Sequence, residues 1–155
     1  MATGDLVPDV AFEGPDGQQT SLAAYRGAPL VLYFYPKDDT SGCTREAQDF
    51  TALAGEFGAA GVALLGVSKD TAKKHKAFTE KYGLKVPLGT DADGKLLEAF
   101  GAWVEKSMYG RKYMGIERST FLIDKDGRIA REWRKVKVPG HAQEVLAAAR
   151  ELAVD

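Results

Sequence analysis

The chain has 155 residues, of which 45% are hydrophobic, so residues 1–155 are enough for one domain with a buried core and too few for two ordinary domains. With 21 basic against 22 acidic residues, the chain is nearly neutral and lacks the positive balance that favours binding to nucleic acid. The sequence shows no basic segment followed by an apolar run at its start and no membrane helix of roughly 20 apolar residues, so we expect a soluble cytoplasmic protein without a membrane partner.

The N-terminal part is predicted to form a short hairpin followed by a buried strand. Residues 10–12 and 18–20 flank the sequence Gly-Pro-Asp-Gly at 14–17, which suits a tight reversal of the chain. Residues 21–25 are predicted to form one helical turn. Residues 30–35 are so rich in branched and aromatic side chains that we expect a central strand, buried on both faces.

A helix and a second strand are predicted to follow. The helix covers residues 43–58, because apolar side chains recur there at steps of four and three, at Cys43, Ala47, Phe50, Ala54 and Phe57. Residues 62–67 form the second strand. A strand, a helix and a strand in this order imply a right-handed crossover and two parallel strands.

The next segment is predicted to be helical and then irregular. Asp70 or Thr71 can cap a helix that ends at Tyr82, with Gly83 as its stop signal. Residues 86–88 are at best a short strand.

The C-terminal half is predicted to add an antiparallel pair of strands and a last helix. Residues 96–103 begin as helix, whereas 105–115, with several basic, aromatic and glycine residues, are interpreted as an irregular surface loop. Two alternating runs at 118–124 and 129–133 surround an Asp-Gly turn and indicate a hairpin. The last helix, from about 141 to 152, covers the sheet. The expected fold class is therefore α/β, with a central mixed sheet flanked by helices and an N-terminal hairpin.

Cys43 is the only cysteine, and it falls in the first turn of a predicted helix. Thr40 or Ser41 is a suitable N-cap, and the free N–H groups and partial positive charge of a helix N-terminus stabilise a thiolate there. A buried free cysteine more often behaves as an inert hydrophobe, and its place on the apolar stripe fits that reading too. Its position after a buried strand and a capped turn favours reactivity. One cysteine excludes an internal disulfide, a CxxC site and a cysteine-rich zinc site.

The sequence PKDDTSGCTREA around Cys43 resembles the active-site loop of peroxiredoxins, in the bacterioferritin comigratory protein (peroxiredoxin Q) branch. The resemblance extends over nearly the whole chain, through GDLVPDVAFEGPDGQQTSL, GVSKDTAKKHKAFTEKYGL, EKSMYGRKYMGIERSTFLIDKDG and VKVPGHAQEVL. Pro36, Thr40 and Cys43 match the family's Pro-x-x-x-Thr-x-x-Cys pattern, and Arg118 matches its active-site arginine.

The resemblance implies a thioredoxin-like fold and a thiol-dependent peroxidase that protects cells against oxidative stress, without a metal or cofactor. Cys43 would be the nucleophile that attacks hydrogen peroxide or an organic hydroperoxide and becomes a sulfenic acid. Thr40 would place its hydroxyl beside the sulfur, and Arg118 would stabilise the thiolate and polarise the peroxide. Pro36 would shield the thiolate from water. From the residues alone, Thr40 is an N-cap, Arg118 a surface ion-pair partner and Pro36 a strand terminator.

The sequence departs from the branch at two positions. Ser41 replaces a usual proline, with a small expected effect. Gln48 stands five residues after Cys43, where many members carry a resolving cysteine. The chain therefore resembles a one-cysteine type that needs an external thiol reductant, such as thioredoxin, glutathione with glutaredoxin, or another low-molecular-weight thiol. We expect a monomer, with a dimer as the alternative.

Other residues and other functions have less support in the sequence. Glu46, one turn into the helix, could support the arginine, but an exposed acid near a helix start is ordinary, so Glu46 is not among the expected site residues. His75 and His141 make a weak case for a metal site or a Cys–His pair. A redox sensor or holdase chaperone on the same fold would explain the missing second cysteine. A cysteine hydrolase would need a histidine base, and a dithiol reductase would need a second cysteine.

Overall fold

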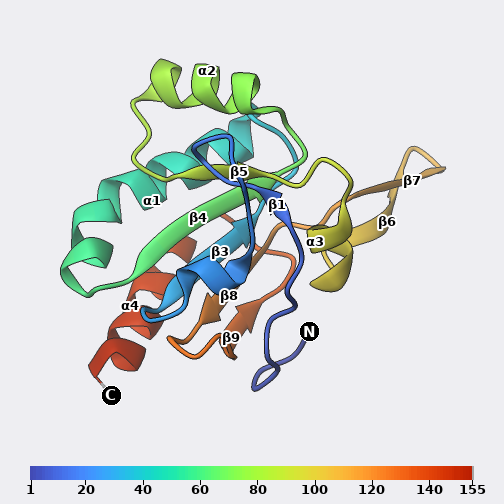
Figure 1. Cartoon of the computed structure of the whole chain (residues 1–155). Helices are drawn as coiled ribbons and strands as arrows, with labels where there is room; N and C mark the ends of the chain where they lie inside the picture. Colours follow the sequence, from blue (N-terminus) through green and yellow to red (C-terminus); the bar gives the residue numbers. More distant parts are fainter. Residues whose placement is uncertain (155) are drawn as a thin grey trace.

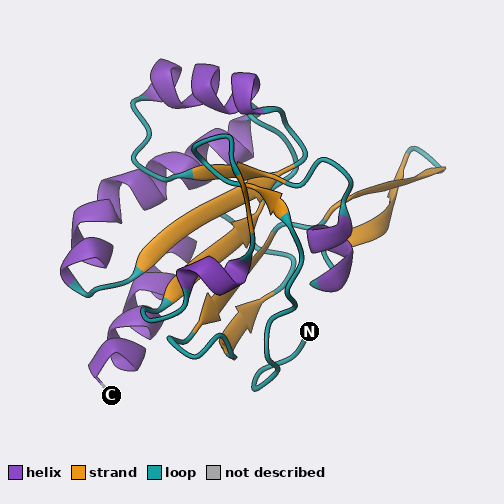
Figure 2. Cartoon of the chain, in the orientation of Figure 1, coloured by secondary structure: helices purple, strands orange, loops and turns teal. Residues whose placement is uncertain are grey.

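A mixed seven-stranded β-sheet runs through the molecule, with helices on both faces (Figure 1, Figure 2). The computed structural model describes residues 1–154. The strand order of the sheet is β2-β1-β5-β4-β3-β8-β9, and β6 and β7 form a separate two-stranded ribbon. The strands are β1 (Phe12–Glu13), β2 (Gln19–Thr20), β3 (Leu30–Phe34), β4 (Ala63–Ser68), β5 (Leu88–Thr90), β6 (Trp103–Met108), β7 (Arg111–Ile116), β8 (Ser119–Ile123) and β9 (Ile129–Trp133). The helices are the 3₁₀ turn η1 (Leu22–Tyr25), α1 (Ser41–Ala59), α2 (Ala72–Tyr82), α3 (Lys95–Ala99) and α4 (His141–Val154).

Strand β3 is central because every one of its side chains is apolar or aromatic and buried. It pairs in parallel with β4 and antiparallel with β8. Its side chains alternate between two cores: Val31 and Tyr33 belong to the core under α1 and α4, and Leu32 and Phe34 belong to the core on the opposite face. The prediction of a central strand buried on both faces is confirmed.

The helices begin and end at the expected kinds of residue. Thr71 caps α2, since its hydroxyl oxygen accepts a hydrogen bond of 3.2 Å from the backbone N–H of Lys74. Gly83 ends the same helix with a φ of 60°, a left-handed conformation that glycine adopts without strain. Helix α1 begins at Ser41, two residues before the predicted start. Among residues 1–154, no helix combines the length and apolar character needed to cross a bilayer.

Both predicted hairpins are confirmed, with β1 antiparallel to β2 and β8 antiparallel to β9. The short strand predicted at 86–88 is displaced, because β5 begins at Leu88. Pro87 has no N–H to donate, so it contributes only its carbonyl, which accepts a hydrogen bond of 3.0 Å from the N–H of Gly66.

The prediction of an irregular loop at 105–115 is wrong, because the segment forms the β6–β7 ribbon, which extends away from the main sheet (Figure 1). Its turn is made by Tyr109 and Gly110, both with positive φ, as a tight two-residue hairpin turn requires. The ribbon has little apolar surface to bury on the main core, and most of its side chains are exposed or half-buried. It therefore lacks the apolar alternation by which a strand is recognised in sequence.

Replacing Gly66 with alanine should destabilise the fold, because a Cβ at this position would lie 2.7 Å from Cζ of the buried Tyr33 ring. Forcing an extra methyl group into a packed core typically costs about 1–3 kcal/mol in the free energy of unfolding. The matched control is Gly55→Ala in α1, where the added methyl meets nothing within 4 Å and should stabilise the helix by about 0.5–1 kcal/mol. Urea unfolding of both variants measures the two effects, and equal stabilities would contradict the close packing of Tyr33 on Gly66.

Candidate active site

The candidate site lies where β3 gives way to α1. After Phe34 the backbone remains extended at Tyr35, whose N–H donates to the carbonyl of Val67 at 3.2 Å, and a turn at residues 36–40 follows. Asp39 in this turn has a φ of 62°, in the left-handed region that aspartate tolerates better than most residues. The turn thus reverses the chain and starts α1 above the end of the central strand.

Cys43 lies in the first turn of α1 and is only 2% exposed. The first bond of the helix runs from the N–H of Thr44 to the carbonyl of Thr40, at 2.8 Å. The N–H groups of Ser41, Gly42 and Cys43 precede this bond, so the helix itself gives them no acceptor. They provide a positive electrostatic potential at the sulfur, as predicted for this position.

Arg118 precedes β8 and reaches the same sulfur. Its Nη2 group donates to Sγ of Cys43 at 3.3 Å, and its Nη1 group donates to Oε1 of Glu46 at 2.7 Å. Burial alone would lower the pKa of Arg118, but the charges of Glu46 and Cys43 beside it raise that pKa overall. Gly42 leaves room for the guanidinium, because a Cβ there would lie 3.2 Å from Nη2. A permanent cation therefore contacts the thiol.

Glu46 was expected to be an exposed acid outside the site, and the structure shows that this prediction is wrong. Its side chain is 1% exposed, Oε1 pairs with Arg118, and Oε2 has no hydrogen-bond partner. Burial raises the pKa of Glu46 from 4.5 to about 7, although Arg118 opposes this rise. The available signal was its spacing, since a residue three positions after Cys43 shares its helix face.

Thr40 and Pro36 lie in the turn, and both are exposed. Thr40 is the N-cap residue of α1 by position, but its side chain makes no capping hydrogen bond. Its hydroxyl instead donates to the carbonyl of Lys37 at 2.8 Å. The single hydroxyl proton of Thr40 is thereby engaged, and its oxygen can still accept a hydrogen bond. The expected capping role of the Thr40 side chain is wrong for this reason.

The two histidines lie in different buried environments. His75 on α2 contacts Asp38, at 2.6 Å between Nδ1 and Oδ2. His141 at the start of α4 shares a hydrogen bond of 2.8 Å with the hydroxyl of Thr120. Burial lowers the pKa of His141 from 6.5 to about 4, so its ring is neutral near pH 7. Within residues 1–154, no cluster of three histidine, cysteine or acidic side chains is placed to hold a metal ion.

Gln48 is exposed on α1, so the position where many members of the branch carry a resolving cysteine faces solvent.

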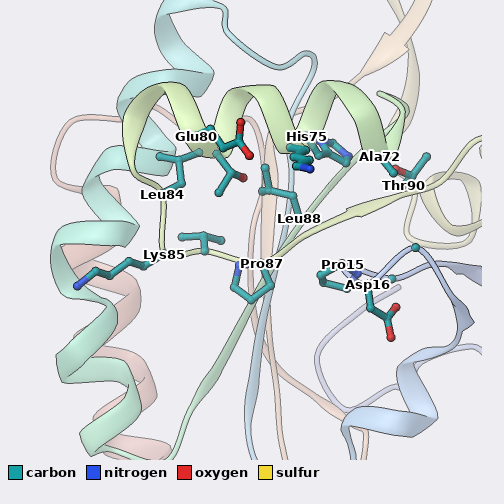
Figure 3. A pocket seen from close by; sticks show the side chains of 15 residues that line it. Pro15, Asp16, Ala72, His75, Glu80, Leu84, Lys85, Pro87, Leu88 and Thr90 are labelled. Atoms are coloured by element: carbon teal, nitrogen blue, oxygen red, sulfur yellow. The ribbon is translucent and has the colours of Figure 1, made fainter.

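A cavity of about 530 Å³ lies between α2, residues 84–88 and the turn at residues 14–17 (Figure 3). His75 contributes to its wall. Of the described residues, those lining the cavity include neither Cys43 nor Arg118, so this cavity is separate from the candidate site.

The chain is similar to known proteins in both sequence and fold. The AhpC/TSA family profile matches residues 3–132. Peroxiredoxin Bcp of Xanthomonas campestris is 51% identical over 92% of this chain and 91% of its own, and peroxiredoxin Bcp of Bacillus subtilis is 47% identical over 97% of this chain and 96% of its own. A solved structure of the X. campestris bacterioferritin comigratory protein, studied for its alkyl peroxide reduction activity, is 47% identical, covers 99% of both chains and has a TM-score of 0.91. This likeness confirms the expected thioredoxin-like fold.

Replacing Glu46 with glutamine should change how the free energy of unfolding depends on pH. Between pH 4.5 and about 7 the folded wild type holds a proton on Glu46 that the unfolded chain has lost, so its stability falls as the pH rises through this window. The variant has no such proton. The stability difference between the two proteins should therefore shift by about 3 kcal/mol across the window, in favour of the variant at the higher pH.

Urea unfolding from about pH 4 to about pH 8 measures this difference. The opposite contribution of His141, whose pKa is lowered, is the same in both proteins and cancels in the comparison. Parallel stability curves for the two proteins would show that folding does not raise the pKa of Glu46.

Proposed function

We propose a function from the family, because the chain belongs to the AhpC/TSA family, in its bacterioferritin comigratory protein (peroxiredoxin Q) branch. It is thus a thiol-dependent peroxiredoxin, and it has one cysteine. In this proposal it reduces hydrogen peroxide and small organic hydroperoxides with electrons from an external thiol. The observation that carries this proposal is the distance of 3.3 Å between the guanidinium of Arg118 and the sulfur of Cys43 at a helix N-terminus. The cation and the helix N–H groups favour the thiolate, which is the reactive form of a cysteine.

The first step is the attack of the Cys43 thiolate on one oxygen of the hydroperoxide. An S–O bond forms as the O–O bond breaks, and the sulfur loses two electrons and becomes a sulfenic acid. The second oxygen leaves as hydroxide or alkoxide and takes a proton from solvent, which gives water or an alcohol. Negative charge moves from the sulfur to the leaving oxygen during this step. Donors that already point at that position lower the barrier most.

Arg118, Thr40 and Pro36 take different roles in this step. Arg118 faces the sulfur and would stabilise charge on the peroxide oxygens as well as on the thiolate. The hydroxyl of Thr40 donates to the backbone carbonyl of Lys37, so its oxygen would accept a hydrogen bond from the O–H group of the bound hydroperoxide and orient that molecule. Pro36 has no N–H and would limit the access of water to the thiolate, the role that its match to the family pattern implies.

The second step returns the cysteine to its thiol form. One external thiol condenses with the sulfenic acid to give a mixed disulfide and water, and a second thiol displaces Cys43 and leaves as a disulfide. Both thiols come from outside, because the chain has one cysteine. Thioredoxin and glutathione with glutaredoxin are two candidate donors. Since Cys43 is 2% exposed, the site has to open for this step.

A redox sensor or holdase chaperone is the second candidate, and the single cysteine favours it. A sensor would consume about one peroxide per chain and stop, whereas a peroxidase turns over as long as a thiol is supplied. The cytoplasmic location, the monomeric state and the single domain of residues 1–155 stay predictions.

A screen of thiol donors with peroxide in excess tests the proposal directly. We expect continuous peroxide consumption with at least one donor, and a mass increase of one oxygen on Cys43 when the donor is withheld and only one equivalent of peroxide is added. Cys43→Ser should abolish both signals. Consumption that stops after one equivalent with every donor would favour the sensor.

Arg118→Ala should slow the oxidation of Cys43 by hydrogen peroxide by about 100-fold or more, because it removes the preorganised cation from both the thiolate and the leaving oxygen. The matched control is Arg131→Ala, whose guanidinium makes an exposed ion pair with Glu144 at 3.2 Å, far from Cys43 along the chain. Rapid mixing with hydrogen peroxide, followed by quenching and mass measurement, gives both rate constants. Equal rates in the two variants would remove Arg118 from the mechanism.

A further inference from the structure

A buried polar cluster joins the turn before Cys43 to helix α2. Asp38 in this turn and His75 on α2 are 5% and 6% exposed at their side chains, and 2.6 Å separates Oδ2 from Nδ1. Nothing in the reaction proposed above uses either residue. We infer that Asp38 and His75 are positioning residues, which hold the turn at residues 36–40 so that Cys43 meets Arg118.

The hydrogen bonds of His75 define a closed arrangement. Its Nε2 lies 2.9 Å from the carbonyl of Gly89 on β5, an acceptor only, so this nitrogen carries a proton. Its Nδ1 faces the carboxylate of Asp38, whose other oxygen accepts a hydrogen bond of 2.5 Å from the hydroxyl of Tyr35. The His75 ring therefore connects the turn to both α2 and β5.

The main chain of the turn at residues 36–40 is also held at Asp38. The N–H of Asp38 donates to Oδ2 of Asp70 at 2.8 Å, and the hydroxyl of Ser68 donates to the same oxygen, also at 2.8 Å. The adjacent Asp39 accepts hydrogen bonds from Lys81 and Tyr82, but it is exposed, and exposed ion pairs contribute little. The buried contacts of Asp38 are thus the strongest links between the turn and the rest of the protein.

The distance between Cys43 and Arg118 depends on these links as well as on the ion pair of Arg118 with Glu46, because the turn at residues 36–40 sets where α1 begins relative to β8. Arg118 precedes β8, whereas Cys43 follows the turn within α1. A turn that moves by about 1 Å would displace the sulfur from the guanidinium and the peroxide, an error that can cost a factor of about 100 in rate.

This inference rests on the proposed function, because the two half-reactions need opposite states of the site. Oxidation by peroxide needs Cys43 held against Arg118. Reduction needs the sulfur exposed to an external thiol, and it is 2% exposed in this structure. Loss of the Asp38–His75 contact should therefore slow the first half-reaction and leave the second as fast or faster, a pattern that general damage to the fold would not produce.

The key variant is His75→Phe, which removes the polar contacts of the ring with Asp38, Gly89 and the hydroxyl of Tyr35. His75 borders the cavity of about 530 Å³, so there is space into which the larger ring can relax (Figure 3). Asp38→Asn is the conservative counterpart. Its amide can donate to Nδ1 of a neutral His75 while its oxygen still accepts from Tyr35, so the geometry survives without the charge. His141→Asn is the control, because it disturbs another buried histidine, which is bonded to Thr120.

Three measurements on the full chain test the inference. They are the rate of Cys43 oxidation by hydrogen peroxide, the rate of reduction of the preformed sulfenic acid by dithiothreitol, and amide hydrogen exchange of residues 36–46. For His75→Phe we expect oxidation to slow by about tenfold or more, reduction to be unchanged or faster, and exchange to speed up by about tenfold or more. Asp38→Asn should retain at least about a third of the wild-type oxidation rate, as a variant that keeps the contact geometry would.

The inference is overturned if His75→Phe oxidises at the wild-type rate, if both half-reactions slow equally, or if His141→Asn gives the same pattern. Failure of the proposed function looks different, because the wild type itself would then not reduce peroxide. Hydrogen exchange would still show whether His75 holds the turn.

Discussion

The site depends on a chain of contacts between one buried acid, one arginine and one thiol. Glu46 and Cys43 lie on one face of α1, and Arg118 enters between them from the start of β8, with separations of 2.7 Å and 3.3 Å. A buried carboxylate or thiolate is costly when it is unpaired, and the guanidinium offsets part of that cost for both. The Arg118 side chain thus contacts two residues that lie 72 and 75 positions before it in the sequence and places a positive charge beside the sulfur.

The topology of the sheet makes this meeting possible. β3 lies between β4 and β8 and runs antiparallel to β8, so the C-terminal end of β3 adjoins the start of β8. Phe34 at the end of β3 is in register with Ser119, the residue after Arg118. The turn that leads to Cys43 and the segment that carries Arg118 therefore emerge at the same edge of the sheet. The buried apolar side chains of β3 fix this edge within the two cores.

The sequence predicted what depends on local pattern. The apolar density of residues 30–35, the helical spacing from Cys43 to Phe57 and the stop at Gly83 each produced an element close to its observed position. What depends on distant contacts was missed. Glu46 and His75 have the polar neighbours of surface residues in the sequence, and only the approach of Arg118 and of Asp38 buries and pairs them. Cys43 could be singled out from its place at a helix start, whereas the roles of Thr40, Pro36 and Arg118 came from the family pattern, because no local rule brings Arg118 to Cys43.

The β6–β7 ribbon has a consequence for the behaviour of the protein in concentrated solution. Within the part of the chain that the structure describes, its two strands pair only with each other, so both outer edges carry backbone groups open to strand addition. Exposed Tyr109 and Met108 at the tip increase the tendency to self-associate. Lys106, Arg111 and Lys112 oppose it, because two ribbons aligned edge to edge would bring like charges together. The same basic residues that gave the segment the look of a loop therefore act as a safeguard against aggregation.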